Sequence, residues 1–188
     1  MTHLGILVAS NRPQSIGARV AGWVEEAAGA FDVDRIDLGS LALPAFDEPY
    51  SPKAGREPEH EHTRAWARRV TALDAAVIVT PQYNGSYPGV LKNAVDFLYA
   101  PWNALPVLVV GYGWGRGGEV IGHLTTLLER VEADHVGSVG LGFREDLSPE
   151  GELFVRPDTA RALSSGLATL TARGSRSARA GGTQVIEC

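Results

Sequence analysis

The chain has almost no cysteine, no long apolar run and no excess of basic residues, and each shortage excludes a class of protein. Its single cysteine, Cys188, is the last of 188 residues, so no disulfide can form within the chain, and a chain end is generally too mobile to hold a reactive thiol. No run approaches the roughly 20 apolar residues of a membrane-spanning helix. The formal net charge of −5 argues against a nucleic-acid or anionic-membrane partner, because such binding requires clustered lysine and arginine.

The start of the chain also lacks a targeting segment. Residues 1–4 lead directly into a strand-like run, without a basic start, a long apolar core or a small-residue cleavage site. With 44% hydrophobic and 21% charged residues, the composition is ordinary for a soluble globular domain. We therefore expect a cytoplasmic protein with no nucleic-acid partner and no membrane partner.

Strand-like runs alternate with helix-like runs along most of the chain. Strands are expected at residues 3–8, 33–38, 75–79, 105–111 and 135–143, with helices near 16–27, 59–73, 90–98, 121–131 and 158–172. This alternation is typical of a parallel sheet covered on both faces. It predicts an α/β fold, a flavodoxin-like doubly wound five-stranded parallel sheet of order 2-1-3-4-5 with helices on both faces. Residues 1–172 would form this one domain, and the Gly-, Ser- and Arg-rich segment 173–188 is expected to be a disordered tail.

The most distinctive segment is the loop after the third expected strand. Residues 81–89 read Pro-Gln-Tyr-Asn-Gly-Ser-Tyr-Pro-Gly and separate an apolar run from a helix-like run. Two prolines stiffen the loop, and the Asn-Gly pair permits positive φ, so its backbone N–H groups can be held in a fixed, outward-facing array. Ligands of open parallel sheets bind at the carboxyl ends of the strands. The loop therefore predicts a platform for a flat polar ligand.

The loop after the first strand, residues 9–17, has the composition of an anion site. Free N–H groups at the start of a helix, two hydroxyls and the Arg12 guanidinium all suit a phosphate, and each hydrogen bond to a charged group contributes about 1.5–3 kcal/mol. Taken alone, the loop is equally compatible with Ser15 as a helix cap and Arg12 as a solvated side chain. It has neither the Gly-Lys-Ser/Thr ending of a nucleotide triphosphatase nor the G-x-G-x-x-G pattern of a dinucleotide site. A single phosphate therefore fits this loop better than a diphosphate.

A glycine-rich turn, residues 113–118, follows the fourth expected strand. By itself it is compatible with a flexible turn that contacts no ligand. Glycines also let a backbone approach a flat ligand closely, and all three loops emerge at the same edge of the predicted sheet. Together they predict a site for a planar heteroaromatic ring that carries one phosphate on a flexible chain, and FMN has this structure.

These loops resemble the motifs of the NAD(P)H-dependent FMN reductase family, a flavodoxin-like group that includes flavin, quinone, azo-dye and chromate reductases. The first family motif, close to G-S-x-R-x-x-S, corresponds to residues 9–15, and the glycine-rich third motif ends at Gly117 and Gly118. The second motif, P-x-Y-N-x-S-x-P-G-x-L-K-N-A-x-D, is highly specific. The chain matches it at Pro81, Tyr83, Asn84, Ser86, Pro88, Gly89, Leu91, Lys92, Asn93, Ala94 and Asp96.

The resemblance, which covers residues 4–143, implies a role for each loop. The first loop would hold the FMN phosphate, the second would line the isoalloxazine with Ser86 as support, and the third would face the ring from the other side. The residues implied in this way are Ser10, Arg12, Ser15 and Ile16 in the first loop, Pro81, Gln82, Tyr83, Asn84 and Ser86 in the second, and Gly113, Gly115 and Gly118 in the third.

Two positions depart from the family pattern. Ala9 stands where the family usually has glycine, and we expect this to tighten the turn before Ser10. Gln82 replaces a frequent glutamate, which removes a negative charge near the ring and is expected to shift the preference for cofactor or substrate. Neither change abolishes the motif.

The resemblance also implies an activity and partners. NADPH or NADH would reduce FMN, which would then pass the electrons to free flavin, a quinone or another small acceptor in a ping-pong cycle, so no side chain is expected to be catalytic and no metal is needed. Tyr83 would contact the nicotinamide or the acceptor, or would equally well pack against a neighbouring subunit. A homodimer or homotetramer is expected, and a flavin-dependent monooxygenase is a further expected partner.

Two other classes of protein share the predicted topology. A flavodoxin-like FMN electron carrier would not oxidise NAD(P)H, but such carriers usually have a hydroxyl-rich phosphate loop and a strongly acidic flavin rim. This chain has Arg12 in its phosphate loop and Arg116 in its glycine-rich turn, which favours a reductase. A receiver-type signalling domain would need carboxylates after the first strand, where this chain has Ser10, Asn11 and Arg12.

Two further features suggest sites but have simpler explanations. His60 and His62 are two residues apart on an expected helix, so their rings should point in different directions, and no third metal ligand is evident. Trp114 is expected to pack in the protein or at an interface, although its position would also let it cover the flavin.

Overall fold

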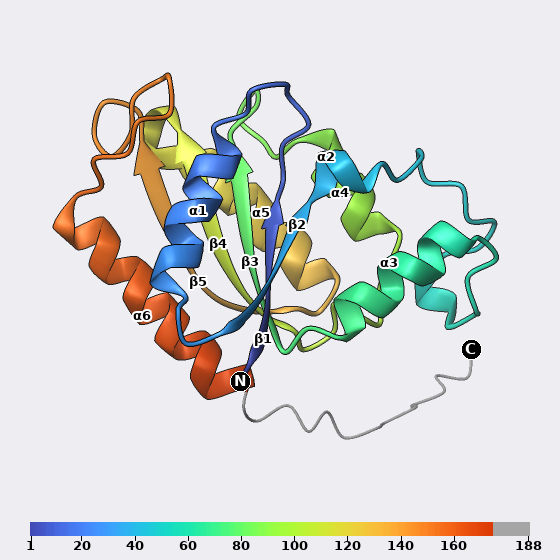
Figure 1. Cartoon of the computed structure of the whole chain (residues 1–188). Coiled ribbons are helices and arrows are strands. Elements are labelled where there is room, and N and C mark those ends of the chain that lie inside the picture. The colour runs from blue at the N-terminus through green and yellow to red at the C-terminus, as the bar shows by residue number, and fades with distance from the viewer. Residues whose placement is uncertain (175–188) are drawn as a thin grey trace.

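The computed structural model describes residues 1–174 and contains one five-stranded parallel sheet (Figure 1). Its strands lie in the order β2-β1-β3-β4-β5, which confirms the predicted order 2-1-3-4-5. The strands are β1 (His3–Val8), β2 (Asp32–Asp37), β3 (Ala75–Pro81), β4 (Pro106–Gly113) and β5 (Asp134–Gly142).

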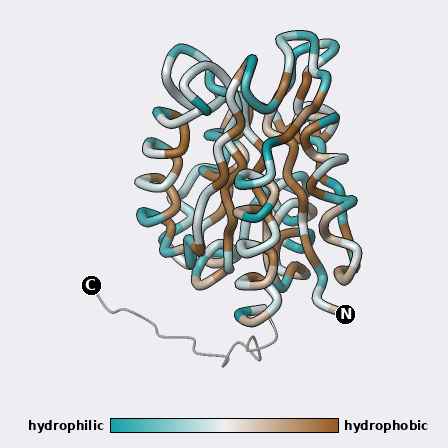
Figure 2. The backbone as a smooth tube through the Cα atoms, turned by 90° about the vertical axis from the view of Figure 1, so that its left-hand side faces the viewer, coloured by the Kyte–Doolittle hydropathy of each residue, from teal (hydrophilic) through white to brown (hydrophobic). Residues whose placement is uncertain are grey.

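Helices cover both faces of the sheet, as the sequence predicts. On one face lie α3 (Glu61–Thr71), α4 (Gly89–Asp96) and α5 (Gly118–Arg130), and on the other lie α1 (Gly17–Ala27) and α6 (Pro157–Gly174). Every residue of β3 and β4 is buried, because helices cover these central strands on both sides. Figure 2 shows the result as a hydrophobic centre of strands beneath more polar loops.

The connection from β2 to α3 is long and contains two short helical segments. It begins with the short α2 (Leu38–Leu41), which Asp37 caps by accepting the backbone N–H groups of Gly39 and Ser40. It continues through the 3-10 helix η1 (Pro52–Ala54) on the side of the molecule where α3 and α4 lie (Figure 1). This segment forms one wall of a second cavity, described below.

The last helix runs to Gly174, two residues beyond the expected end at Ala172. Arg173 extends this helix and forms an ion pair with Asp134 at 2.7 Å. The rest of the segment that was expected to be disordered, residues 175–188, lies outside the described residues. Within residues 1–174, no helix combines the length and the apolar character needed to cross a membrane.

Because all five strands are parallel, their carboxyl ends share one edge, at the top of Figure 1. The connections after β1, β3, β4 and β5 leave from this edge, and the connection after β4 forms the 3-10 helix η2 (Trp114–Gly117). The three loops that the sequence singles out are therefore neighbours in space.

Candidate functional site

A cleft of about 400 Å³ opens among the loops at the carboxyl edge of the sheet. Pockets for small molecules generally measure about 300–1,000 Å³, so this cleft can accept a ligand of ordinary cofactor size. Its lining comes from the connections after β1, β3, β4 and β5: Arg12, Gln14, Ser15, Ile16, Pro81, Gln82, Tyr83, Tyr112, Gly113, Trp114, Phe143 and Pro149.

The connection from β1 to α1 presents unpaired donors to this cleft. Helix α1 starts without a side-chain cap and without an acidic residue in its first turn. Ser15 lies one residue before the N-cap residue Ile16, and its Oγ accepts the N–H of Gly17 at 3.0 Å. The N–H groups of Gln14 and Ile16 make no hydrogen bond within residues 1–174. Arg12 is exposed and has no ion pair in the same part of the chain. A free guanidinium beside free N–H groups at a helix start suits an anion.

A hydrogen bond joins the first loop to the second. Ser10, which is 5% exposed, places its Oγ 2.9 Å from the Tyr83 hydroxyl and also accepts the N–H of Arg12 at 3.4 Å. The Arg12 guanidinium lies 5.9 Å from the centre of the Tyr83 ring, within cation–π range. Tyr83 therefore connects the two loops, a role that the sequence analysis did not consider.

The second loop is a tight hairpin. Tyr83 and Ser86 exchange two backbone hydrogen bonds, of 2.8 and 2.9 Å, around Asn84 and Gly85. Both central residues have positive φ, 49° and 79°, which confirms the expected conformation of the Asn-Gly pair.

The hairpin changes which backbone N–H groups can face a ligand. The N–H groups of Gln82 and Tyr83 donate within the protein, to Tyr112 O at 3.0 Å and to Ser86 O at 2.8 Å, so they are not the outward-facing donors that the sequence suggested. Those of Asn84 and Gly85 make no hydrogen bond within residues 1–174 and stay available to a ligand.

Gln82 connects the second loop to the third. Its side-chain oxygen accepts the N–H of Val120, at the start of α5, at 3.3 Å. Helix α5 has no side-chain cap of its own because its N-cap residue is Gly117. Gln82 therefore satisfies one of the free donors that every helix start leaves.

The third loop is held by glycine geometry and by charge. Gly117 has a φ of 65°, and a Cβ at this position would lie 2.9 Å from backbone atoms of Gly111 and Tyr112, so only glycine fits without a shift. The neighbouring Arg116 also has a positive φ, of 59°, and its guanidinium reaches Asp146 at 3.1 Å and Thr159 at 3.0 Å.

Asp146 is the centre of this charged cluster and is fully buried. Its carboxylate accepts hydrogen bonds from Thr159 Oγ1 at 2.8 Å, from the N–H of Gly142 at 3.1 Å and from Arg156. In the sequence, Arg116 stood out as a cation of the glycine-rich turn that favours a reductase over an electron carrier. Its charge is paired with Asp146 and, at 3.5 Å, with Glu145.

Several residues of the cleft were missed in the sequence: Gln14, Tyr112, Phe143 and Pro149. Burial raises the pKa of Tyr112 to about 12, against the opposing effect of a hydrogen bond from the side chain of Ser15. Tyr112 lies near the carboxyl end of a buried strand, and that position alone could have indicated a place in the cleft. Gln14 stands at a variable position of the first motif, and Phe143 and Pro149 lie in the connection after β5, whose sequence carries no motif.

The predicted site residues fall into three groups. Seven of them line the cleft: Arg12, Ser15, Ile16, Pro81, Gln82, Tyr83 and Gly113. Ser10 supports the cleft from beneath, through Tyr83. Asn84, Ser86, Gly115 and Gly118 belong to the same loops without forming its walls.

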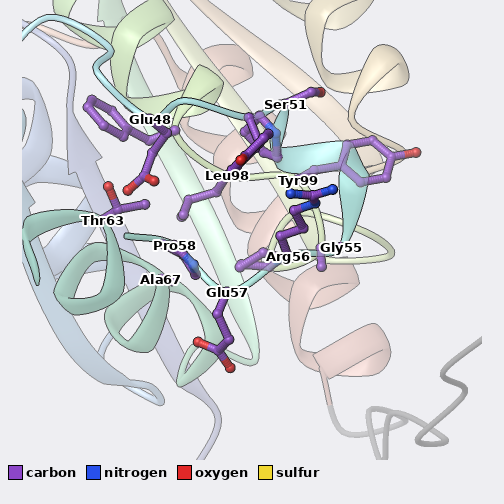
Figure 3. A pocket seen from close by; sticks show the side chains of 15 residues that line it. Glu48, Ser51, Gly55, Arg56, Glu57, Pro58, Thr63, Ala67, Leu98 and Tyr99 are labelled. Atoms are coloured by element: carbon purple, nitrogen blue, oxygen red, sulfur yellow. The ribbon is translucent and has the colours of Figure 1, made fainter. Parts of the chain in front are cut away.

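A second cavity, of about 220 Å³, lies between the connection from β2 to α3, helix α3 and residues 97–101 (Figure 3). Tyr50, Phe97 and Tyr99 contribute to its mainly apolar walls. Glu48 accepts the N–H groups of Glu59 and His60 at the start of α3, at 2.9 and 3.1 Å. The Thr63 hydroxyl is buried beside the Glu48 carboxyl but makes no hydrogen bond of normal geometry.

The two histidines near this cavity do not point in different directions. Their rings stack with centres 5.2 Å apart, because His60 is the extended N-cap residue of α3 and does not follow helical spacing. His62 Nε2 lies 2.9 Å from Asp47 Oδ1. Within residues 1–174, no group of three or more His, Cys, Asp or Glu side chains is arranged to hold a metal ion.

Comparison with known proteins bears on both the sequence and the fold. The family model described as NADPH-dependent FMN reductase matches residues 2–146. An NAD(P)H-dependent FMN reductase of Saccharomyces cerevisiae is 34% identical over 151 residues, which cover 73% of this chain and 79% of that protein. One from Schizosaccharomyces pombe is 40% identical over 123 residues, covering 63% of this chain and 62% of that protein. A 2-hydroxy-1,4-benzoquinone reductase of a Burkholderia species is 28% identical, over 84% of this chain and 80% of the relative.

Solved structures of low sequence identity share the fold. An oxidoreductase of Corynebacterium diphtheriae superposes with a TM-score of 0.70 at 20% identity, over 93% of this chain and 97% of its own. The flavodoxin of Megasphaera elsdenii gives a TM-score of 0.58 at 16% identity, over 88% of this chain and 98% of its own. These likenesses place the chain among flavodoxin-like folds.

Proposed function

Because the chain belongs to the NADPH-dependent FMN reductase family, we propose that it uses FMN to take a hydride from NAD(P)H and pass the electrons to a small acceptor by a ping-pong mechanism. The observation that carries this proposal is the cleft in which Arg12, the free N–H groups before α1 and the hairpin of the second loop come together. Relatives named as FMN reductases and as quinone reductases support free flavin and quinones as the acceptors.

The residues present fit FMN. A phosphate needs a cation and several N–H donors, and Arg12 with the unpaired donors near Ser15 supplies them on one wall. A flat ring needs a rigid backbone surface, and the hairpin around Asn84 and Gly85 supplies that. Glycine at position 113 lets the end of β4 lie close to Gln82, since a Cβ there would lie only 3.2 Å from Gln82 Cβ.

The chain itself orients the reactants and stabilises charge. Bound FMN supplies the redox chemistry, accepting a hydride and releasing electrons. The free N–H groups of Asn84 and Gly85 lie in the same hairpin as the cleft residue Tyr83, beside the walls of the cleft, and would stabilise negative charge on a ring that extends over this hairpin. The Ser10–Tyr83 and Gln82–Val120 hydrogen bonds hold these donors in place before the ligand arrives, so little reorganisation is required.

Gln82 is the position at which this chain would differ from relatives that have glutamate there. The amide oxygen accepts from Val120 as a carboxylate would, but it brings no charge to the cleft. We propose that this favours negative charge on the reduced ring and on bound substrates.

We further propose a homodimer or homotetramer in the cytoplasm, with a flavin-dependent monooxygenase as one recipient of reduced flavin. The family resemblance supports the assembly, and light scattering on the purified protein tests it. A single monomeric species at micromolar concentration would overturn it.

The deciding experiment measures FMN binding and NAD(P)H oxidation together. The protein is titrated with FMN and followed by flavin fluorescence, and NADH and NADPH oxidation is then recorded with 1,4-benzoquinone, with and without FMN. We expect binding, FMN-dependent oxidation and parallel double-reciprocal plots. FMN binding without any NAD(P)H oxidation would instead indicate an electron carrier, and absence of both would overturn the proposal.

A further inference from the structure

Trp114 is an exposed aromatic side chain at the rim of the cleft. It lies in η2 and is 58% exposed, although large apolar side chains are usually buried. Its ring meets Phe143 edge to face, with centres 5.3 Å apart, and both residues line the cleft. One face of the indole is therefore supported, and much of the rest is open to a ligand.

The Arg144 guanidinium lies 5.4 Å from the centre of the Trp114 ring. Arg144 is exposed and has no ion pair within residues 1–174. It has a φ of 67°, which is rare for a residue with a side chain and fixes the direction of the chain at the end of β5. The indole and the guanidinium are thus presented together.

Arg144 differs from two other arginines of this loop cluster because they have acidic partners. Arg116 and Arg156 are both paired with Glu145 and Asp146, the two acidic residues that follow Arg144 in the sequence. On the opposite wall, Arg12 is assigned to the FMN phosphate. Arg144 is therefore the cation left for another ligand at the Trp114 side of the cleft.

We infer that Trp114 and Arg144 form a recognition element for the second ligand of the reductase, a planar aromatic molecule that carries an anionic group. The ring would stack on the indole, and the anion would pair with the guanidinium. Two sources share this chemistry: an acceptor with an anionic substituent, and the adenosine 2′-phosphate of NADPH. The inference rests on the proposed function and adds the class of ligand that this site prefers.

The test compares matched substrates on the FMN-loaded enzyme. The acceptors are 1,2-naphthoquinone-4-sulfonate and uncharged 1,2-naphthoquinone, and the donors are NADPH and NADH. The variants are Arg144→Gln, Arg144→Lys and Trp114→Leu, with Arg130→Gln as a control because Arg130 is an exposed arginine at the far end of α5. Thermal melting and FMN titration establish that each variant is folded and loaded.

We expect Arg144→Gln to raise KM for either the naphthoquinone sulfonate or NADPH about two- to fivefold more than KM for its counterpart, 1,2-naphthoquinone or NADH. This range corresponds to the loss of one exposed ion pair. Arg144→Lys should restore most of the difference, and 0.5 M salt should abolish it. Trp114→Leu should raise KM for both naphthoquinones. An effect on the sulfonate assigns the anion to the acceptor, and an effect on NADPH alone assigns it to the donor.

The inference would be overturned if the Arg144 variants changed KM equally for charged and uncharged ligands, or no more than Arg130→Gln does. The wild-type activity would still support the proposed function in that case. An inactive, FMN-free wild-type protein would instead overturn the proposed function. If Trp114→Leu does not fold, Trp114→Phe tests the same stacking contact with a smaller ring.

Discussion

The two cavities of this molecule differ in what holds their walls. The cleft at the carboxyl edge is built from four connections joined by directed polar contacts, among them Ser10 with Tyr83 and Arg116 with Asp146. The cavity beside α3 has mainly apolar walls, and the buried hydroxyl of Thr63 lies beside Glu48 without a hydrogen bond of normal geometry. This comparison indicates that polar groups held in fixed positions, more than apolar walls, distinguish a binding site for a charged cofactor from a cavity that results from side-chain packing.

Removing the buried carboxylate of Asp146 should have the largest effect on the stability of the protein. Asp146→Ala leaves two guanidinium groups without their shared partner, and we expect the free energy of unfolding to fall by about 3 kcal/mol, the lower end for a broken buried pair because both arginines reach water. Urea denaturation measures this. Glu48→Ala, the matched change beside the other cavity, removes the acceptor for the N–H groups of Glu59 and His60 just before α3 and should cost only about 1 kcal/mol. Equal losses would contradict the comparison.

Arg12→Ala should weaken FMN binding by about 1.5–3 kcal/mol, which is about 10- to 150-fold, because a charge-assisted bond to the phosphate is lost. Quenching of flavin fluorescence on titration gives the dissociation constant. Arg56→Ala is the control, since Arg56 lies over Tyr50 at the other cavity, and it should leave FMN affinity unchanged. Similar affinities for the two variants would remove Arg12 from the site.

Two buried threonines allow a smaller, symmetrical test. Thr159 Oγ1 donates to Asp146 and accepts from Arg116, so Thr159→Val should lower the free energy of unfolding by about 1–2 kcal/mol. Thr63→Val replaces a hydroxyl that lies beside the Glu48 carboxyl without a hydrogen bond of normal geometry, so it should change that free energy by less than about 1 kcal/mol. Thermal and urea denaturation report both changes. A loss of stability in Thr63→Val as large as that in Thr159→Val would mean that the Thr63 hydroxyl bonds the Glu48 carboxyl.

The last prediction concerns the stability of the protein at alkaline pH. Burial raises the pKa of Tyr112 to about 12, whereas an unfolded tyrosine ionises near 10. The unfolded state therefore loses its proton first, and the stability that the neutral phenol contributes below pH 10 is lost as the pH rises from about 10 to 12. Tyr112→Phe should lose less stability between pH 8 and 11 than the wild type does. A Tyr99→Phe variant at the other cavity should differ from the wild type less, because Tyr99 is only partly buried and its pKa is raised chiefly by a hydrogen bond to Glu132.

The sequence predicted the fold well because the fold depends on local, repeated signals. Buried runs such as the one in β3 and the turn chemistry of Asn84-Gly85 identify strands and loops, and parallel topology then brings the loops together. The motif positions Arg12, Gln82 and Tyr83 line the cleft for the same reason.

The contacts within the cleft could not be predicted in this way. The pairing of Arg116 with Asp146 joins residues 30 apart in sequence through a side-chain direction that no periodic pattern encodes. The Ser10–Tyr83 bond spans 73 residues, and the stacked rings of His60 and His62 depend on where α3 begins. Such contacts follow from tertiary packing, which overrides expectations drawn from local spacing.

The order of the strands has a consequence for synthesis of the protein. β1 leaves the ribosome first but lies inside the sheet between β2 and β3, and the residues that line the cleft extend from Arg12 to Pro149. A nascent chain can therefore begin its sheet early, yet it cannot complete the cleft until Pro149 has been made. FMN can stabilise only a chain that has reached this residue, so a shortage of FMN would affect late steps of folding and leave the early steps unchanged.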